Sequence, residues 1–387
     1  WNADHGETIP GLPPFQGGIA GLFGYDLARG LETLPEKSLR NPMMPDMALG
    51  LYDRLIAFDH IKKKAWIVVQ ASDKEDAEQK RAEVFSELKP KPSASLPPLA
   101  KFGEKKLTWQ PLYKKDEYKA DIQKIIDYIR AGDLFQANLS QRFEAVLPPD
   151  YNPFAHYLTL RTVNPAPFAA YMNIGGVIIA SASPEQFLSV EDGIVTTRPI
   201  KGTIPRGQNK EDDAANRKKL ESSFKDRAEN IMIVDLLRND LSKVCEPNSI
   251  ELVDLCKTES FASVHHLVST IRGKLKKTPM ELLRACFPGG SITGAPKIRA
   301  MEIIEELEPL RRGPYCGSIG WVGFDGAMDS NILIRTLVYQ GNRVSLQTGG
   351  GITAQSNPEE EYEETLVKAA RILKSFEGAQ EKTKKQA

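Results

Sequence analysis

Two short stretches of the sequence place a carboxylic acid and an amine in apolar surroundings. Glu185 lies between the apolar runs 177–180 and 187–188, and Lys201 follows the apolar pair 194–195. Short apolar runs of this kind are typical of buried strands. The pattern therefore predicts two strands that carry an acid and a base to the same end of a sheet, and an addition and elimination reaction needs that pairing.

The amine of Lys201 must lose its proton before it can attack a substrate. A free lysine has a pKa near 10.4, so only about one in two thousand is uncharged at neutral pH. Burial beside a cation, either Arg198 or a metal ion, would lower this pKa and make Lys201 a nucleophile, while Glu185 protonates the leaving group. An ordinary ion pair at a sheet edge is the alternative, and spacing alone favours it.

Two predicted helices each present a pair of carboxylates three residues apart. Asp226 and Glu229 share a face of the helix predicted over 209–243, and Glu361 and Glu364 share a face of the final predicted helix. Two such faces could hold Mg2+ through oxygen ligands and leave positions for water and an anionic substrate. Charge runs on helices are usually solvated, so the pattern alone also allows two exposed faces without a metal.

The overall composition limits the classes of partner. Hydrophobic residues make up 41% and charged residues 26% of the 387 residues, which is ordinary for a soluble globular protein. Lys plus Arg equals Asp plus Glu at 51 each, so no global positive field attracts nucleic acid or anionic lipid. No apolar run approaches the roughly 18 residues of a membrane span. We therefore expect no nucleic-acid partner and no membrane segment.

The cysteines and the first residue bear on the compartment. The cysteines at 245, 256, 286 and 316 show no C-x-x-C spacing, and no signal-peptide pattern follows Trp1. This predicts reduced thiols in a cytoplasmic protein. A start at Trp rather than Met also predicts that the chain is a fragment.

A mixture of helices and strands must hold these residues in place. Apolar residues at helical spacing predict a helix from Lys114 to about Gly132, and alternation over 135–146 predicts a strand. Pro358 is placed to open the final helix. The other predicted elements are strands at 47–58, 65–69, 249–256, 261–272, 315–324, 328–338 and 343–348, and helices at 73–88 and 152–163.

A Pro-rich segment divides the chain. Residues 89–112 contain Lys-Pro-Lys-Pro and Leu-Pro-Pro, which are typical of a linker. We therefore expect an N-terminal portion and linker at 1–112, a catalytic portion at 113–375 and a solvated tail at 376–387.

Three motifs resemble those of the chorismate-binding enzymes. They are Arg-Pro-Ile-Lys-Gly-Thr at 198–203, Ser-Pro-Glu at 183–185 and the glycine-rich run at 287–297. The resemblance extends over most of the chain and is greatest to the aminodeoxychorismate-forming branch, since anthranilate synthases typically carry alanine where Lys201 stands. It implies an α+β fold in which two large, mostly antiparallel β-sheets stack with helices outside. It also implies that the first strands of the N-terminal region are absent here.

The resemblance assigns roles to individual residues. It implies that Lys201 is the nucleophile, Glu185 the acid, and His266 the group beside the departing ring hydroxyl. It implies a Mg2+ site in which Glu229 and Glu364 bind directly and Asp226 and Glu361 act through water. The implied contacts to the substrate, a dianion, are Arg335 for the enolpyruvyl carboxylate, together with Ser291, Tyr315, Gly349, Gly350, Gly351 and Lys368.

Structural explanations compete with several of these roles. A lone histidine in a strand is structural more often than catalytic, and His265 and His266 must point to opposite faces. Arg335 could pair with a structural carboxylate. In tryptophan-binding relatives a Pro-Phe pair that matches Pro167 and Phe168 lines a tryptophan pocket, but a plain proline turn is the simpler explanation.

The implied reaction converts chorismate and ammonia to 4-amino-4-deoxychorismate, a transferase reaction that leads to para-aminobenzoate and folate. The sequence contains no Gly-x-Cys-x-Gly motif of a glutaminase. Ammonia would therefore come from free ammonium or from a separate glutamine amidotransferase subunit in a heterodimer. The alternatives are an anthranilate synthase component I and, more distantly, a non-catalytic subunit that binds chorismate or tryptophan.

Overall fold

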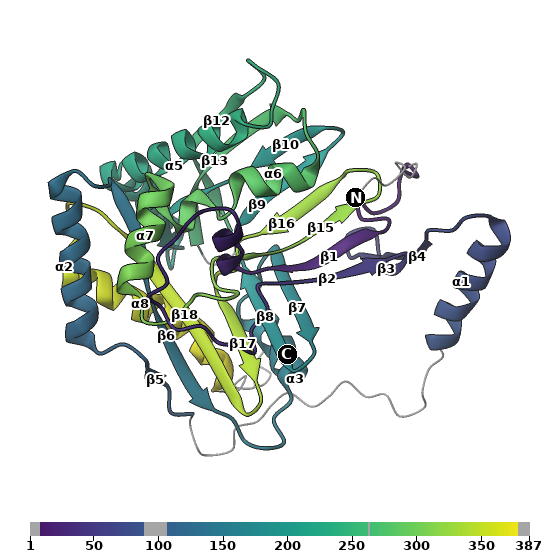
Figure 1. The fold of residues 1–387 in the computed structure, drawn as a ribbon, viewed down its shortest axis with the longest axis horizontal. Coiled ribbons are helices and arrows are strands. Elements are labelled where there is room, and N and C mark those ends of the chain that lie inside the picture. The colour runs from purple at the N-terminus through teal and green to yellow at the C-terminus, as the bar shows by residue number, and fades with distance from the viewer. Residues whose placement is uncertain (1–7, 89–106, 262–263, 378–387) are drawn as a thin grey trace.

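The computed structural model describes residues 8–88, 107–261 and 264–377. Within these ranges the chain forms two large sheets that stack, with most helices on the outside (Figure 1). Every strand pairing in the two large sheets is antiparallel. The prediction of an α+β fold with stacked antiparallel sheets is confirmed.

The first sheet contains nine of the described strands in the order β11-β13-β10-β9-β16-β15-β1-β2, with β12 also paired to β13. Strand β1, near the N-terminus, pairs with β15, which lies almost 300 residues later in the chain. The strands of this sheet are β1 (Gly18–Phe23), β2 (Met47–Tyr52), β9 (Gln186–Glu191), β10 (Ile194–Thr197), β11 (Ile200–Pro205), β12 (Glu251–Ser260), β13 (Val264–Lys274), β15 (Ser318–Gly323) and β16 (Met328–Asn331).

The second sheet contains seven of the described strands in the order β14-β6-β18-β17-β8-β7, with β5 also paired to β6. Strands β6 and β18 form its long central pair, in register from Val146 and Arg343 to Ala137 and Ile352. The strands are β5 (Gln110–Pro111), β6 (Gln136–Val146), β7 (Phe168–Ile174), β8 (Val177–Ser183), β14 (Gly294–Ala295), β17 (Thr336–Gln340) and β18 (Arg343–Ile352).

Helices cover the outer faces of both sheets (Figure 1). One apolar core lies between the first sheet and α5 with α6, and another lies between the second sheet and α3 with α8. A smaller cluster that includes Leu22 of β1 and Ile179 of β8 joins the two sheets. The helices are α2 (Lys115–Ala131), α3 (Pro153–Val163), α4 (Lys210–Glu221), α5 (Phe224–Ser242), α6 (Pro279–Cys286), α7 (Lys297–Leu307) and α8 (Pro358–Leu373), with short 3-10 turns η1 (Tyr25–Gly30), η2 (Gly290–Ile292) and η3 (Lys374–Phe376).

A hairpin and one helix project from this body. Strands β3 (Arg54–Asp59) and β4 (Lys64–Val69) pair with each other, and α1 (Lys74–Glu87) packs against β4 and stands apart in Figure 1. The predicted strand at 47–58 is therefore two strands that join different sheets. The predicted linker lies outside the described residues over 89–106, and its last part includes β5.

Two long predicted elements are each divided in the structure. The single helix predicted over 209–243 is wrong, because α4 ends at Glu221 and Ser223 caps a new helix by accepting a hydrogen bond from the Asp226 amide at 3.3 Å. The single strand predicted over 328–338 is also wrong, because β16 and β17 belong to different sheets.

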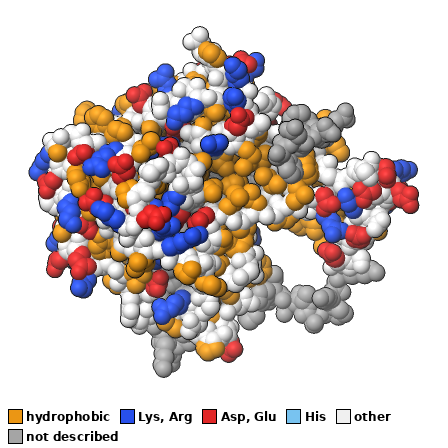
Figure 2. Space-filling view, viewed as in Figure 1, with side chains coloured by type: hydrophobic (Ala, Val, Ile, Leu, Met, Phe, Trp, Pro, Cys, Tyr) orange, Lys and Arg blue, Asp and Glu red, His pale blue; other side chains and the backbone are white. Residues whose placement is uncertain are grey.

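Charges of both signs are mixed over the visible face of the molecule (Figure 2), as expected from the equal totals. All four cysteines are free and buried. No helix in the described parts of the chain has both the length and the apolar character needed to cross a membrane.

Candidate active site

The chain passes from one sheet to the other at two neighbouring crossovers. Residues between β8 and β9 cross at Glu185, and residues between β16 and β17 cross at 332–335. The crossovers bond to each other, since the Ile332 amide donates to the Glu185 carbonyl at 3.1 Å and the Ser183 hydroxyl donates to the Ile332 carbonyl at 2.6 Å. Glu185 and Arg335 are therefore both placed where the sheets meet.

Glu185 is a buried carboxyl with few compensating contacts. Burial raises its pKa, while a hydrogen bond from Ser291, the charge of Lys201 and the Ile200 amide oppose that rise. The electrostatic contact with Lys201 shows that β9 and β11 bring the predicted acid and amine close together. A carboxyl whose pKa is raised by burial is suited to donate a proton.

Lys201 is held by a carboxylate from the opposite helix. Its Nζ lies 2.8 Å from Glu229 Oε1, and each side chain is 12% exposed. Burial alone would lower the pKa of Lys201, but the charge of Glu229 outweighs it and the pKa is raised. Burial alone would raise the pKa of Glu229. The charge and hydrogen bond of Lys201, together with the hydrogen bond from Gln136, outweigh burial, so the pKa of Glu229 is lowered.

The expectation that Arg198 lies beside Lys201 and lowers its pKa is wrong. Arg198 forms an ion pair with Glu259 of β12 instead. Arg198 precedes β11, whereas Lys201 lies inside it, and the two side chains find carboxylates on different elements. The neighbour that controls Lys201 is an anion, not a cation.

The two acidic helix faces meet beside the glycines of β18. A Cβ atom on Gly351 would lie 2.6 Å from Glu229 Oε1, and one on Gly350 would lie 3.1 Å from Glu361 Oε2 and 3.9 Å from Glu364 Oε1. Helices α5 and α8 thus direct their carboxylates to adjacent glycines. Asp226 lies slightly apart, next to Gly202, with its side-chain carbons 3.0 Å from where a Cβ on that glycine would stand.

Three of these four carboxylates, those of Glu229, Glu361 and Glu364, are each balanced by a lysine. Lys225 reaches Glu361 at 3.4 Å and Lys368 reaches Glu364 at 2.6 Å, in addition to the pair of Lys201 with Glu229. No three His, Cys, Asp or Glu side chains among the described residues are grouped closely enough to hold a metal ion as they stand. The donor set is nevertheless all oxygen, and its negative charges attract cations, which fits a hard divalent ion that keeps several waters.

The charge of Arg335 acts on both Glu185 and His266. None of the described carboxylates lies within ion-pairing distance of its guanidinium, so the competing idea of a structural ion pair has no support. Burial and the nearby Arg371 lower the pKa of Arg335, while Glu185 opposes that change. Its backbone has φ 52°, an uncommon value for a large side chain, and such strain is typical of functional sites.

The glycine run of β18 has one open edge. Gly349, Gly350 and Gly351 pair with β6, but β17 pairs with β18 only as far as Leu346. Lys368 Nζ donates to the Gly349 carbonyl at 2.8 Å on this segment. The open edge leaves room for a ligand to approach the backbone where side chains would block it.

The two adjacent histidines have different surroundings. His266 is buried, and its Nδ1 lies 2.7 Å from the Thr203 hydroxyl on β11. Burial, with Arg335 nearby, lowers the pKa of His266 to about 4, so the ring is neutral at physiological pH. His265, on the other face, lies between Ser260 and Asp213 at 2.8 and 3.0 Å.

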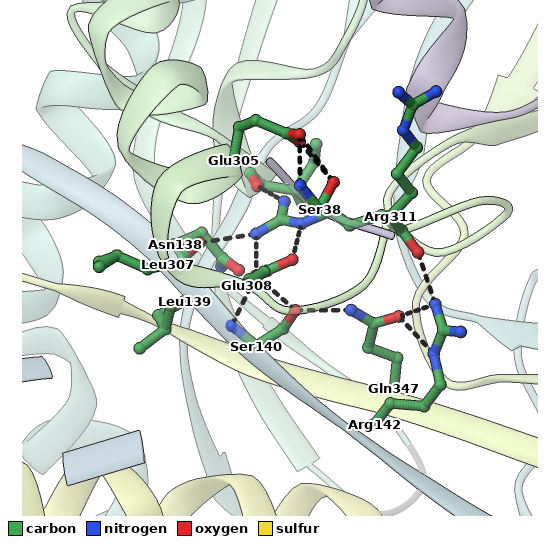
Figure 3. Close-up of polar contacts among 12 residues, drawn as sticks. Ser38, Asn138, Leu139, Ser140, Arg142, Glu305, Leu307, Glu308, Arg311 and Gln347 are labelled. Carbon is green, nitrogen blue, oxygen red and sulfur yellow. Dashed lines mark hydrogen bonds and ion pairs between the residues drawn. The ribbon is translucent and has the colours of Figure 1, made fainter. Parts of the chain in front are cut away.

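A buried ion pair supports the loop that carries Ser291. Arg312 lies 2.7 Å from Glu308 and donates to the carbonyls of Ile292 and Asn138 at 2.9 and 2.7 Å. Glu308 in turn accepts from the Ser140 amide and hydroxyl (Figure 3). Tyr315 is buried, and the centre of its ring lies 5.7 Å from the guanidinium of Arg312.

Two residues with a predicted role lie away from this group. Pro167 precedes β7, at the edge of the second sheet, and Phe168 is its first residue. The Phe168 carbonyl accepts a hydrogen bond from Asn331 at 2.9 Å. Their role in tryptophan binding remains a prediction.

Gln136 is a site residue that the sequence reasoning missed. Its Nε2 donates to Glu229 Oε1 at 2.6 Å, and its own Oε1 is buried without a partner among the described groups. An unsatisfied buried amide oxygen is costly and usually has a functional reason. The available signal was the set of polar residues at 136, 138 and 140, which alternate with the apolar Ala137 and Leu139 at the start of the strand.

Comparison with known proteins gives a consistent result. The sequence matches the chorismate binding enzyme family over residues 2–374. It is 44% identical over 377 residues to aminodeoxychorismate synthase component 1 of Salmonella typhimurium, a match that covers 96% of this chain and 79% of that protein. It is 41% identical to anthranilate synthase component 1 of Thermus thermophilus, with coverage of 97% and 80%.

A solved structure supports the same relationship. Anthranilate synthase component I from Streptococcus pneumoniae superposes with a TM-score of 0.83 at 35% identity, covering 96% of this chain and 83% of that one.

Proposed function

Because the chain belongs to the family of chorismate-binding enzymes, we propose that it is the chorismate-aminating subunit of an aminodeoxychorismate synthase. The observation that carries the proposal is the buried Lys201, 2.8 Å from Glu229 and in electrostatic contact with Glu185. The resemblance to the family distinguishes the two synthases at this position, where anthranilate synthases typically carry alanine.

In the first half of the proposed reaction, Lys201 first releases its proton to solvent, which a cation bound at Glu229 would favour by removing the anion that raises the pKa of the amine. The neutral amine then adds to C2 of chorismate and the ring double bonds migrate. Glu185 donates a proton to the C4 hydroxyl, which leaves as water. His266, whose ring is neutral at physiological pH, is proposed to lie beside this hydroxyl and to orient it as it departs. The product of this half is a covalent lysyl intermediate, which divides one difficult displacement into two easier steps.

In the second half, ammonia adds to C4 and the double bond migrates back, which expels the lysine amine from C2. The product is 4-amino-4-deoxychorismate. Gln136, with its unpaired buried Oε1 near Glu229, is placed to accept a hydrogen bond from the incoming nitrogen. No further bond is broken, and Lys201 is restored.

The substrate is a dianion, and the site offers separate partners for its two carboxylates. Arg335 presents a guanidinium without a carboxylate partner among the described residues and can form a bidentate pair with the enolpyruvyl carboxylate. The open edge of Gly349, Gly350 and Gly351 can supply backbone donors. Ser291 and Tyr315 complete the proposed pocket.

The ring carboxylate is proposed to bind on the opposite side, at the acidic faces of α5 and α8. Glu229 and Glu364 are the proposed direct ligands of Mg2+, and Asp226 and Glu361 are proposed to act through water. When bound, the ion would neutralise the ring carboxylate and fix its position. The three lysines that now balance the acidic group then become free to contact substrate.

Ammonia is proposed to come from a separate glutamine amidotransferase subunit. The relatives are called component 1, which implies a second component, and the sequence lacks a glutaminase motif. With glutamine as nitrogen source, we expect turnover only after a glutaminase is added, whereas ammonium supports turnover by itself. Turnover of glutamine by the purified chain alone would contradict this part of the proposal.

The decisive experiment is to mix the protein with chorismate and Mg2+ in the absence of ammonia and to analyse it by mass spectrometry. We expect an adduct of chorismate less water on Lys201, and none on Lys201→Ala. We expect Lys201→Ala also to lose at least about a hundredfold in amination rate, judged from typical single catalytic groups. Full activity in Lys201→Ala, with no adduct on the wild-type protein, would exclude the covalent route.

Anthranilate synthesis is the second candidate, because the Thermus thermophilus anthranilate synthase component 1 is nearly as similar to this chain. That reaction also releases pyruvate and gives a fluorescent product. Chromatography of the product made from chorismate and ammonium separates the two activities. A fluorescent anthranilate peak with stoichiometric pyruvate would replace the present assignment.

A further inference from the structure

A polar cavity lies away from the proposed catalytic group. Its volume is about 80 Å3, which is room for several water molecules or one small ligand, since a single water needs roughly 10–15 Å3. We call it the arginine cavity, because five arginines but only three carboxylates line it. Its walls include Arg40, Arg142, Arg311, Arg343, Met44 and Val338.

The arginine cavity and the catalytic group share one face of the second sheet. Residues two apart on a strand point the same way, so Gln136, Ser140 and Arg142 of β6 lie on one face. Gln136 contacts Glu229, whereas Arg142 lines the cavity. Six residues of strand separate them, which corresponds to roughly 20 Å. The Glu308 network in Figure 3 lies between the two places.

Three of the five cavity arginines are already paired. Arg40 lies 3.0 Å from Asp46, Arg312 lies 2.7 Å from Glu308, and Arg343 lies 3.5 Å from Glu144. The third carboxylate of the lining, Asp26, accepts from the Gly313 amide and lies 3.5 Å from Arg29. These pairs leave Arg142 and Arg311 without a carboxylate partner among the described residues.

Arg142 is held firmly but is not neutralised. Its Nη2 donates to the Arg311 carbonyl at 2.7 Å, and Nε and Nη2 both donate to Gln347 Oε1 at 3.3 and 3.2 Å (Figure 3). Its Nη1 has no acceptor in the described part of the chain. Burial lowers the pKa of Arg142, yet a guanidinium stays charged in proteins. Arg311 has a buried Nε that likewise lacks an acceptor.

The remaining walls are mixed: one part carries the polar side chains of Asn41, Thr336, Gln340, Ser345 and Gln347, and another part is apolar. Met44, Pro314, Tyr315 and Val338 line the same cavity. An uncompensated positive charge beside apolar walls favours an anion that also carries a small hydrophobic part. Inorganic phosphate has the charge but no apolar part.

We propose that the arginine cavity is a binding site for a small organic carboxylate, whose anionic group pairs with Arg142 and whose apolar part lies against Met44 and Val338. The site is distinct from the proposed chorismate pocket, since only Tyr315 lines the cavity among the residues assigned to that pocket. It fits a carboxylate because Nη1 of this immobilised guanidinium offers two N–H donors, whereas Nε and Nη2 already donate to Gln347 and the Arg311 carbonyl.

Calorimetric titration with benzoate tests the proposal. The carboxylate of benzoate could also bind Arg335, so the titration uses Arg335→Gln as the background. We expect benzoate to bind this variant, benzamide and phosphate to bind at least tenfold more weakly, and the double variant Arg335→Gln/Arg142→Gln to lose at least about tenfold in affinity. Absence of benzoate binding to Arg335→Gln, or unchanged affinity in the double variant, overturns the proposal.

A second variant keeps Arg142 and blocks the cavity from within. Val338→Glu places a carboxylate beside Arg142, and we expect it to abolish benzoate binding in the Arg335→Gln background. Val163→Glu, at the exposed end of α3, is the matched control and should bind as before. A crystal of wild-type protein soaked in benzoate should show the carboxylate at Arg142. A crystal that shows benzoate only at Arg335 would contradict the site. Equal affinities of Val338→Glu and Val163→Glu for benzoate would contradict it as well.

Discussion

Glu185 combines burial with a position at the boundary of the two sheets, and this makes its protonation central to the proposed chemistry. Replacing it by glutamine keeps the shape and the contact with Ser291 but removes the acidic proton. We expect Glu185→Gln to lower kcat by roughly 10²–10⁴-fold with little change in KM, which is typical for loss of a general acid. Chromatographic rate measurement with ammonium checks this. Glu191→Gln at the exposed end of β9 is the control, and equal rates in both variants would deny Glu185 the role of acid.

We expect Arg335 to contribute mainly to the affinity for chorismate. Its guanidinium is free to pair with a substrate carboxylate, and hydrogen bonds to charged groups contribute about 1.5–3 kcal/mol. We therefore expect Arg335→Gln to reduce kcat/KM for chorismate by roughly 10–150-fold, mainly through KM. Arg284→Gln, an exposed arginine of α6, serves as the matched control. Steady-state kinetics with an unchanged KM in Arg335→Gln would contradict the assignment.

His156 gives a prediction about stability and pH. Its Nε2 faces the Ser375 hydroxyl, which itself donates to the Ile372 carbonyl, and its Nδ1 faces the Tyr339 hydroxyl. Burial lowers its pKa to about 4, so the folded state resists the proton that the unfolded state takes up near pH 6.5. The stabilisation is complete above pH 6.5 and is lost as the pH falls through about 4.

The contribution of His156 to the free energy of unfolding should fall by roughly 3 kcal/mol between pH 7 and pH 4, because one pKa unit corresponds to about 1.4 kcal/mol. Urea denaturation between pH 4 and 7 measures the slope. His156→Gln should show a shallower pH dependence than wild type, whereas His60→Gln, an exposed histidine, should not change it. A slope unaltered by His156→Gln would show that other groups cause the acid sensitivity.

At the scale of residues, the sequence indicated that Glu185 and Lys201 lie near each other. It did not predict the direction in which the pKa of Lys201 is shifted. The pattern and the resemblance placed Glu185 and Lys201 together, and in the structure they are close enough for the charge of each to shift the pKa of the other. The sequence could not show that Glu229 is the partner of Lys201, because that contact joins β11 to α5 across the fold. Gln136 was missed for the same reason.

At the scale of elements, helix ends were predictable because their signals are local. Gly132 ends α2 and Pro358 opens α8, both as expected, and α1 begins at the predicted place with Asp73 as its cap. The divided elements were not predictable from local signals. The break between β16 and β17 arises because the chain moves from one sheet to the other, and that change depends on distant strand partners. The apolar run Ile332-Leu333-Ile334 lies at this break and reads as part of a buried strand, which hides the change of sheet.

The N-cap of α8 matters because this helix carries Glu361 and Glu364. The Asn357 side chain accepts hydrogen bonds from the amides of Glu359 and Glu360 at 2.9 and 3.3 Å. We expect Asn357→Ala to lower the free energy of unfolding by about 1 kcal/mol, and Asn357→Gly by only a few tenths. Urea denaturation at neutral pH compares the two. A larger loss in Asn357→Gly than in Asn357→Ala would show that the cap is not the reason for asparagine here.

At the scale of the whole molecule, the ion pair of Glu308 and Arg312 ties distant segments together. Arg312 is fully buried and contacts β6, the loop at Ile292 and the end of α7. Removing one partner of a buried pair leaves a charge without compensation and typically costs about 3–5 kcal/mol. We expect that loss in Arg312→Met, measured as the free energy of unfolding.

An exposed pair with the same spacing provides the control for Arg312→Met. Arg217 and Glu221 are also four residues apart, at 2.9 Å, but both are exposed. Arg217→Met should cost less than about 1 kcal/mol. Similar losses for the two variants would mean that burial does not decide the strength of the Glu308 pair.

The arrangement of strands within the two sheets was the least predictable feature. The sequence predicts that strands exist, but β1 pairs with β15 rather than with a neighbour in the chain. Such long-range partners depend on which apolar faces meet in the folded state. The class of fold followed from family resemblance, and periodicity alone could not have supplied it.

The two crossovers also determine how the protein should come apart. Glu185 and residues 332–335 are bonded to each other, and each belongs to a chain segment that continues into both sheets. Neither sheet can then open separately without breaking this junction, so we expect a ligand held by Glu185 and Arg335 to make unfolding more cooperative. Occupancy of such a site would slow amide exchange along β8, β9, β16 and β17 together, far from any atom that the ligand touches.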